Sequence, residues 1–214
     1  TQIGKTSALE EYQRTHNHGQ TIYLRMPEGG GLRDMLHRLA GILRISTQSA
    51  NLKDRIIDAF DNRMCLLVDE AHQPFLTARG SSRIRALEYL RDLFDAKRCG
   101  MVLVGTDVLD YELQDGAHRK LLKQFTRRGL RAVRLPDRPT AADLTLIAKH
   151  YGLASAAGEA LDLQTRIIRD HGLGSWFSLL QAGSRMATKA QDKLSWSHII
   201  KADAALDRLA GLSR

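Results

Sequence analysis

Leu66-Leu67-Val68-Asp69-Glu70 is an apolar run that ends in two carboxylates. A short aliphatic run of this kind is typical of a strand buried on both faces of a parallel sheet. Ligands of such sheets bind at the carboxyl edge, so Asp69 and Glu70 are predicted to lie at a binding edge. There Asp69 is suited to the coordination shell of a magnesium ion, and Glu70 is suited to polarise a water molecule.

Gly4-Lys5-Thr6 lies upstream of this strand and matches the second half of a phosphate-binding loop, G-x-x-x-x-G-K-[ST]. In that loop the glycine lets backbone N–H groups approach phosphate, the lysine reaches the β and γ oxygens, and the hydroxyl holds magnesium. The stretch that follows has a helical pattern, as a phosphate site at a helix N-terminus requires. The first glycine and the strand before it would precede Thr1, so we expect the chain to be part of a longer protein.

Together the two motifs predict a nucleotide site that takes ATP and Mg²⁺. Its phosphate-binding residues are expected to be Gly4, Lys5, Thr6 and Ser7, with Thr6 and Asp69 on the metal. A further apolar strand, Val102-Leu103-Val104, is followed by Gly105 and Thr106. Thr106 is predicted to orient the attacking water between the two motifs.

Short apolar segments alternate with segments of helical period in the first part of the chain, which predicts an α/β fold with a parallel sheet. The predicted strands are 21–26, 64–68, 100–105 and 131–135, and the predicted helices are 6–15, 31–43, 52–62, 82–96 and 118–127. Two prolines near residue 137 interrupt this pattern, and Thr140 with Asp143 forms a helix N-cap signature. We therefore expect a nucleotide-binding domain over 1–137 and a helical lid domain over 138–214, with helices 141–151, 157–170, 175–190 and 197–209.

The composition favours an anionic partner. The 214-residue chain carries a formal net charge of +8, and between Gly116 and Pro136 it has seven Lys or Arg and no acid. No apolar run is long enough to cross a membrane. The two cysteines, Cys65 and Cys99, form neither a disulfide framework nor a zinc site, which favours a reducing, cytoplasmic location.

The motif series resembles the AAA+ ATPases, with Lys5-Thr6 as Walker A, Asp69-Glu70 as Walker B, Thr106 as sensor 1 and Arg127 as arginine finger. More narrowly, it is similar to the transposition regulators typified by the phage Mu B protein, with TnsC and TniB as relatives. That resemblance implies a ring or helical filament on double-stranded DNA, a transposase partner, and an arginine acting in trans on a neighbour's nucleotide. Arg128 is the alternative finger.

Two positions depart from the family pattern. The family's second sensor arginine has no counterpart in the stretch from His171 to Phe177, and Thr106 replaces a common asparagine. The resemblance also suggests DNA contacts at and after the predicted strand 21–26, and in the segment after Walker B. The candidates are Arg25, Arg33, His37 and Arg38 in the first segment and Arg79, Arg83 and Arg85 in the second.

Other functions are weighed against this one. Asp69-Glu70-Ala71-His72 also spells the DEAH box of certain helicases, but the region after Arg138 offers no strand for their second sheet domain. His72 is therefore predicted to lie at the start of the next helix or in a loop. A non-enzymatic nucleotide-binding scaffold, and a secretion or replication-loader ATPase, remain alternatives.

Overall fold

The computed structural model describes residues 3–16, 20–28, 31–77, 82–116, 119–126, 132–136, 138–209 and 211. The chain divides into two compact units, Lys5–Ala132 and Val133–Arg214, the latter counted together with Thr1–Gly4. We call them the α/β unit and the helical unit. The nucleotide-binding and lid domains on either side of residue 137 stay a prediction.

A three-stranded parallel sheet forms the centre of the α/β unit. Its strands are β1 (Thr21–Arg25), β2 (Cys65–Asp69) and β3 (Gly100–Leu103), in the order β1-β2-β3. Leu66, Leu67 and Val68 on the central strand are at most 1% exposed, as expected for a strand covered on both faces. The predicted parallel sheet is confirmed, with three of the four predicted strands in place.

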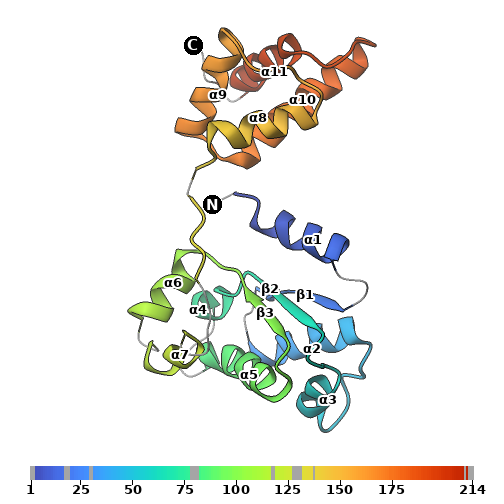
Figure 1. Cartoon of the computed structure of the whole chain (residues 1–214), viewed down its shortest axis with the longest axis vertical. Coiled ribbons are helices and arrows are strands. Elements are labelled where there is room, and N and C mark those ends of the chain that lie inside the picture. The colour runs from blue at the N-terminus through green and yellow to red at the C-terminus, as the bar shows by residue number, and fades with distance from the viewer. Residues whose placement is uncertain are drawn as a thin grey trace. The chain divides into compact units, whose positions relative to one another are not determined.

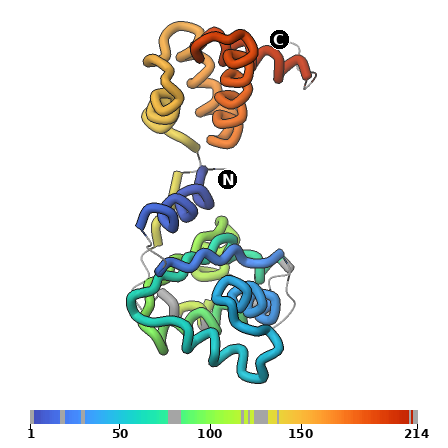
Figure 2. Tube along the Cα trace, turned by 90° about the vertical axis from the view of Figure 1, so that its right-hand side faces the viewer, coloured from blue at the N-terminus to red at the C-terminus, as the bar shows by residue number. Residues whose placement is uncertain are grey.

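Helices cover both faces of the sheet. On one side lies α1 (Lys5–His16), and on the other lie α2 (Leu32–Leu43), α3 (Leu52–Asp58) and α5 (Ser82–Lys97) (Figures 1 and 2). The α2 helix turns Met35, Leu36, Leu39 and Ala40 inward, the one-sided apolar spacing that the sequence predicts for a helix packed on a sheet. The remaining helices are α4 (Gln73–Thr77), α6 (Asp107–Gln114) and α7 (Arg119–Thr126).

Several sequence predictions differ from the structure. The α3 helix ends at Asp58, before the predicted end at Asn62, and α4 and α6 were not predicted. The prediction of a strand over 131–135 is wrong for the described residues 132–135, which form no regular structure and leave Val133 81% exposed. A strand needs a neighbour to pair its N–H and C=O groups, and no described strand lies next to this segment.

The helical unit contains α8 (Ala141–His150), α9 (Glu159–Asp170), α10 (Leu173–Lys189) and α11 (Trp196–Leu209) (Figure 1). Trp176 is fully buried at its centre, and its ring stacks on Trp196 with centroids 6.1 Å apart. The predicted capping signature is confirmed, because the Asp143 backbone N–H donates to Thr140 Oγ1 and the Thr140 N–H donates back to Asp143. Every helix in the described part of the chain is too short or too polar to span a bilayer.

Replacing Gly183 by alanine should destabilise the helical unit by about 1–2 kcal/mol, because overpacking costs more than the better helix propensity of alanine returns. A Cβ at residue 183 would lie 3.2 Å from Ile199 Cα and 3.3 Å from Ile199 N, so the α11 backbone must shift. Tryptophan fluorescence during urea unfolding reports this unit, which holds both tryptophans of the chain.

The matched control is Gly41→Ala in α2, where a Cβ meets nothing within 4 Å. Its free energy of unfolding, followed by circular dichroism, should rise by up to about 1 kcal/mol. Equal losses in both variants would contradict the packing argument.

Candidate nucleotide-binding site

The first turn of α1 has the form of a phosphate-binding helix end. Gly4 adopts φ +81°, a conformation that favours glycine, and the helix begins at the next residue, Lys5. No acidic residue lies in the first turn, where Lys5 and Thr6 are half-buried and Ser7 is exposed. Free N–H groups and a lysine at one helix end attract an anion.

Thr6 joins this helix end to strand β2. The Thr6 hydroxyl donates to Asp69 Oδ2 at 2.7 Å, across 63 residues of sequence. Asp69 is only 2% exposed, and its Oδ1 accepts the Glu70 backbone N–H at 3.0 Å. The structure therefore brings together Thr6 and Asp69, the two residues that the sequence predicts for the metal.

Tyr23 is a member of the site that the sequence did not predict. It lies on β1, and its hydroxyl donates to the same Asp69 Oδ2 at 3.0 Å. Burial and this hydrogen bond raise the pKa of Tyr23 to about 12, so the hydroxyl is a proton donor at neutral pH. The only signal in the sequence was a tyrosine hydroxyl in the middle of a predicted strand.

Glu70 stands directly after β2 in an uncommon backbone conformation. Its φ is +55°, which costs a residue with a side chain roughly 1–3 kcal/mol. Two contacts hold the turn, since the Glu70 N–H bonds to Asp69 Oδ1 and the Glu70 carbonyl accepts the Gln73 N–H at 3.0 Å. The carboxylate is 30% exposed and lies 3.4 Å from Nδ1 of the buried His72.

Thr106 lies at the same edge of the sheet. Two residues before it, the Val104 N–H donates to the Val68 carbonyl and the Val104 carbonyl accepts the Ala71 N–H, both at 2.8 Å. Thr106 is the N-cap residue of α6, yet its hydroxyl makes no capping bond. Its Oγ1 is buried and has no hydrogen-bond partner among the described residues, so it is free to bind a water molecule or a ligand.

The oxygen pair of Thr6 and Asp69 fits a magnesium ion bound together with a nucleotide. Adjacent ligands about 2.1 Å from an octahedral Mg²⁺ are about 3.0 Å apart. The two oxygens are 2.7 Å apart, close to that spacing. Within the described ranges no group of three or more His, Cys, Asp or Glu side chains could hold a metal, so a cation here depends on phosphate and water ligands as well.

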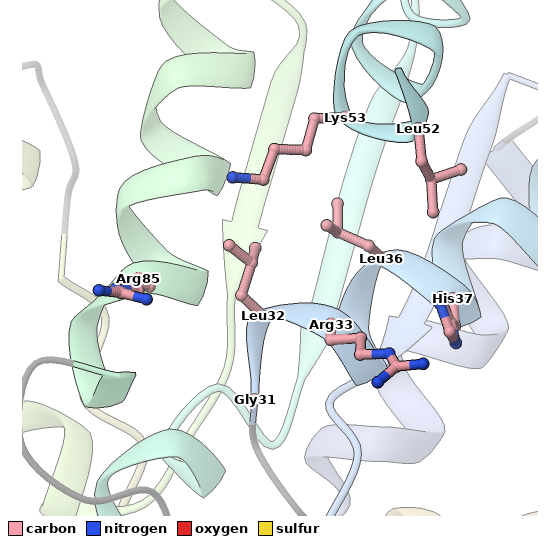
Figure 3. A pocket seen from close by; sticks show the side chains of 8 residues that line it. All are labelled: Gly31, Leu32, Arg33, Leu36, His37, Leu52, Lys53 and Arg85. Atoms are coloured by element: carbon pink, nitrogen blue, oxygen red, sulfur yellow. The ribbon is translucent and has the colours of Figure 1, made fainter. Parts of the chain in front are cut away.

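A second feature is an open cavity of about 370 Å³ at the N-terminal ends of α2, α3 and α5. Its floor is apolar, and four exposed basic side chains surround it: Arg33, His37, Lys53 and Arg85. No acid is among the described residues that line it. Figure 3 shows Lys53 extending toward the helix that carries Arg85, and Arg33 and His37 projecting from α2. We call this cavity, with the four basic residues around it, the cationic groove.

The predicted DNA contacts are only partly brought together. Arg33, His37 and Arg85 lie in the groove. Arg25 is instead the strand partner of Asp69 at the sheet edge, and Arg38 donates to the Arg25 carbonyl at 2.9 Å. Lys53 was missed, because nothing in the sequence shows that α3 begins beside α2. Arg83 belongs to α5, but the structure does not describe its side chain. Arg79 and both finger candidates, Arg127 and Arg128, lie outside the described residues.

Tyr23→Phe should raise the Mg²⁺ concentration needed for half-maximal nucleotide binding by about tenfold, because residues that orient a metal ligand tune its affinity. Asp69 loses one of its hydroxyl donors in this variant while the strand keeps its aromatic ring. Titration of a fluorescent ATP analogue against Mg²⁺ measures the shift. Tyr12→Phe, at an exposed tyrosine of α1, is the control and should leave the titration unchanged. Identical curves for all three proteins would contradict a role for Tyr23.

Comparison with known proteins identifies the family. A family model described as AAA domain matches residues 1–111, just over half of the 214-residue chain. The matched region contains the Gly4–Thr6 turn, Asp69, Glu70 and Thr106. No curated protein matches the chain. The chain therefore belongs to the AAA domain family of P-loop ATPases.

Proposed function

We propose that the protein is an ATP-dependent, DNA-binding regulator of DNA transposition that hydrolyses ATP as an oligomer. The observation that supports the ATPase part is the Thr6–Asp69 hydrogen bond at 2.7 Å, which joins the N-terminal end of α1 to the carboxylate at the end of β2. A bound ATP with its magnesium would supply the phosphoryl group and neutralise its charge.

Each site residue then has a distinct role. Lys5 binds the β- and γ-phosphate oxygens from the start of α1, and Thr6 and Asp69 hold the cation. Glu70 takes the proton of the attacking water. The Thr106 hydroxyl, which has no partner among the described residues, orients that water. Arg127 acts from a neighbouring subunit on the charge that develops in the transition state, so an isolated subunit hydrolyses ATP slowly.

The cationic groove supports binding of the DNA backbone. Four basic side chains around one cavity, on a chain of net charge +8, attract phosphates without reading sequence. The assignment to transposition rests on the similarity of the motif series to the Mu B group. Homo-oligomerisation on duplex DNA and a transposase as partner follow from that similarity.

Glu70→Gln should keep ATP binding, lower the hydrolysis rate by about 10²–10⁴-fold, and keep the protein assembled on duplex DNA when ATP is present. The amide retains the size of the side chain but accepts no proton from water. Phosphate release measures hydrolysis, a fluorescent ATP analogue measures binding, and electron microscopy shows assembly.

The outcomes separate the alternatives. Wild-type protein that binds ATP without hydrolysing it, with DNA present and with no effect of Glu70→Gln, would support a non-enzymatic scaffold. Hydrolysis that Glu70→Gln abolishes, without ATP-dependent filaments or rings on DNA, would instead indicate a secretion or replication-loader class of AAA+ ATPase.

Lys53→Gln should weaken binding to duplex DNA of any sequence and lower the slope of log Kd against log salt by about 0.9, because one phosphate contact is lost. Fluorescence anisotropy at several salt concentrations measures the slope. The control is Lys97→Gln, which removes the same charge. Lys97 pairs with Asp58 at 3.3 Å and lies at the other end of α5 from Arg85, about 18 Å away along the helix. Equal effects of both substitutions would show that only net charge matters.

A further inference from the structure

His72 is a buried histidine next to the site, and the proposed mechanism gives it no role. It lies between the end of β2 and the start of α4 and is 5% exposed. Within the described part of the chain its Nδ1 is buried and has no hydrogen bond of good geometry. The nearest charged group is Glu70, whose Oε2 lies 3.4 Å from this nitrogen.

Packing alone does not explain a histidine here. Ala71 and Phe75, which lie close to it in the sequence, are buried apolar residues, so a buried polar side chain stands out in this segment. An unpaired buried polar atom costs about 1–3 kcal/mol, and this cost disappears if Nδ1 donates to a carboxylate. A small rotation of the Glu70 side chain shortens 3.4 Å to a charge-assisted hydrogen bond of about 2.8 Å.

The backbone keeps the two side chains together. Glu70 has a positive φ, and the Gln73 N–H donates to the Glu70 carbonyl while the Phe75 N–H donates to the His72 carbonyl, each at 3.0 Å. The residue between them, Ala71, donates its N–H to the Val104 carbonyl at 2.8 Å. His72 is thus fixed relative to both Glu70 and the strand that leads to Thr106.

We infer that His72 is a positioning residue for Glu70, donating a hydrogen bond from Nδ1 that holds the carboxylate in the orientation in which it accepts the proton of the attacking water. This inference rests on the proposed ATPase function. The balance of the reaction is unchanged: water oxygen bonds to the γ-phosphorus, the bond to the β–γ bridging oxygen breaks, and the water proton goes to Glu70. His72 fixes the geometry of that acceptor, so its loss affects turnover rather than ATP binding.

His72→Phe should lower kcat by about 10- to 100-fold while leaving the KM for ATP and the melting temperature nearly unchanged. His72→Asn should recover much of the loss, because its amide nitrogen can donate from a position close to that of Nδ1. His150→Phe, at an exposed histidine of α8, is the matched control and should have wild-type kcat. Equal losses in the Phe and Asn variants, or a wild-type kcat for His72→Phe, would overturn the inference.

A double variant tests whether His72 acts through Glu70. In the Glu70→Gln background, His72→Phe should lower the residual rate by less than twofold, because residues that act as a unit have non-additive effects. A full additive loss would overturn the inference.

A second readout does not require hydrolysis. The ¹⁵N chemical shift of His72 Nδ1 should change when Glu70 becomes Gln, and should stay the same in the control Glu88→Gln on α5. If wild-type protein hydrolyses no ATP, the proposed function fails, and this shift still decides whether His72 and Glu70 interact. An unchanged Nδ1 shift overturns the inference even if the enzyme is active.

Discussion

The hydrogen bond from Thr6 to Asp69 connects two segments that the chain separates by 63 residues. The rest of the site depends on it, because α1 has little other anchorage. Only Leu9 on that helix is buried, and a second polar contact runs from Gln13 to the Thr21 carbonyl. Leu9 and these two hydrogen bonds therefore hold α1 on the sheet, and the bond from Thr6 sets which carboxylate its N-terminal end faces. A phosphate bound at that helix end would therefore lie next to a cation bound at Asp69.

The edge of the sheet provides the rigid part of the site. Hydrogen bonding continues past the strands, from the Met26 N–H to the Asp69 carbonyl and from the Val104 N–H to the Val68 carbonyl. The loops after all three strands consequently start from fixed positions. The position of β2 is well defined, because Leu66 and Val68 pack into the hydrophobic core cluster of the α/β unit. Side chains on such a rigid element are placed more precisely than side chains on loops.

Much of this arrangement follows from local sequence signals. The aliphatic run before Asp69 predicts β2, the helical periods predict α2 and α5, and the G-K-T motif predicts that Thr6 and Asp69 meet. Tyr23 could not be predicted, because its contact depends on the register between β1 and β2. Lys53 could not be predicted either, since its place in the groove depends on how α3 packs beside α2. The predicted strand over 131–135 failed for a related reason: β propensity does not supply the partner that a strand needs.

The backbone conformation of Glu70 differs from that of the other residues with a positive φ in where it occurs. Among the described residues, four other than glycine have a positive φ, and three of them, Arg44, Arg98 and Gln191, stand just after helices. There a left-handed residue is an ordinary way to end a helix. Glu70 follows a strand and has no such reason. It also lies at the sheet edge where His72 Nδ1 and Thr106 Oγ1 are buried without hydrogen bonds in the described structure. The positive φ of Glu70 and the two buried polar atoms without hydrogen bonds all reduce the stability of the fold. Their occurrence at one edge of the sheet is typical of a site that binds a ligand and a water molecule.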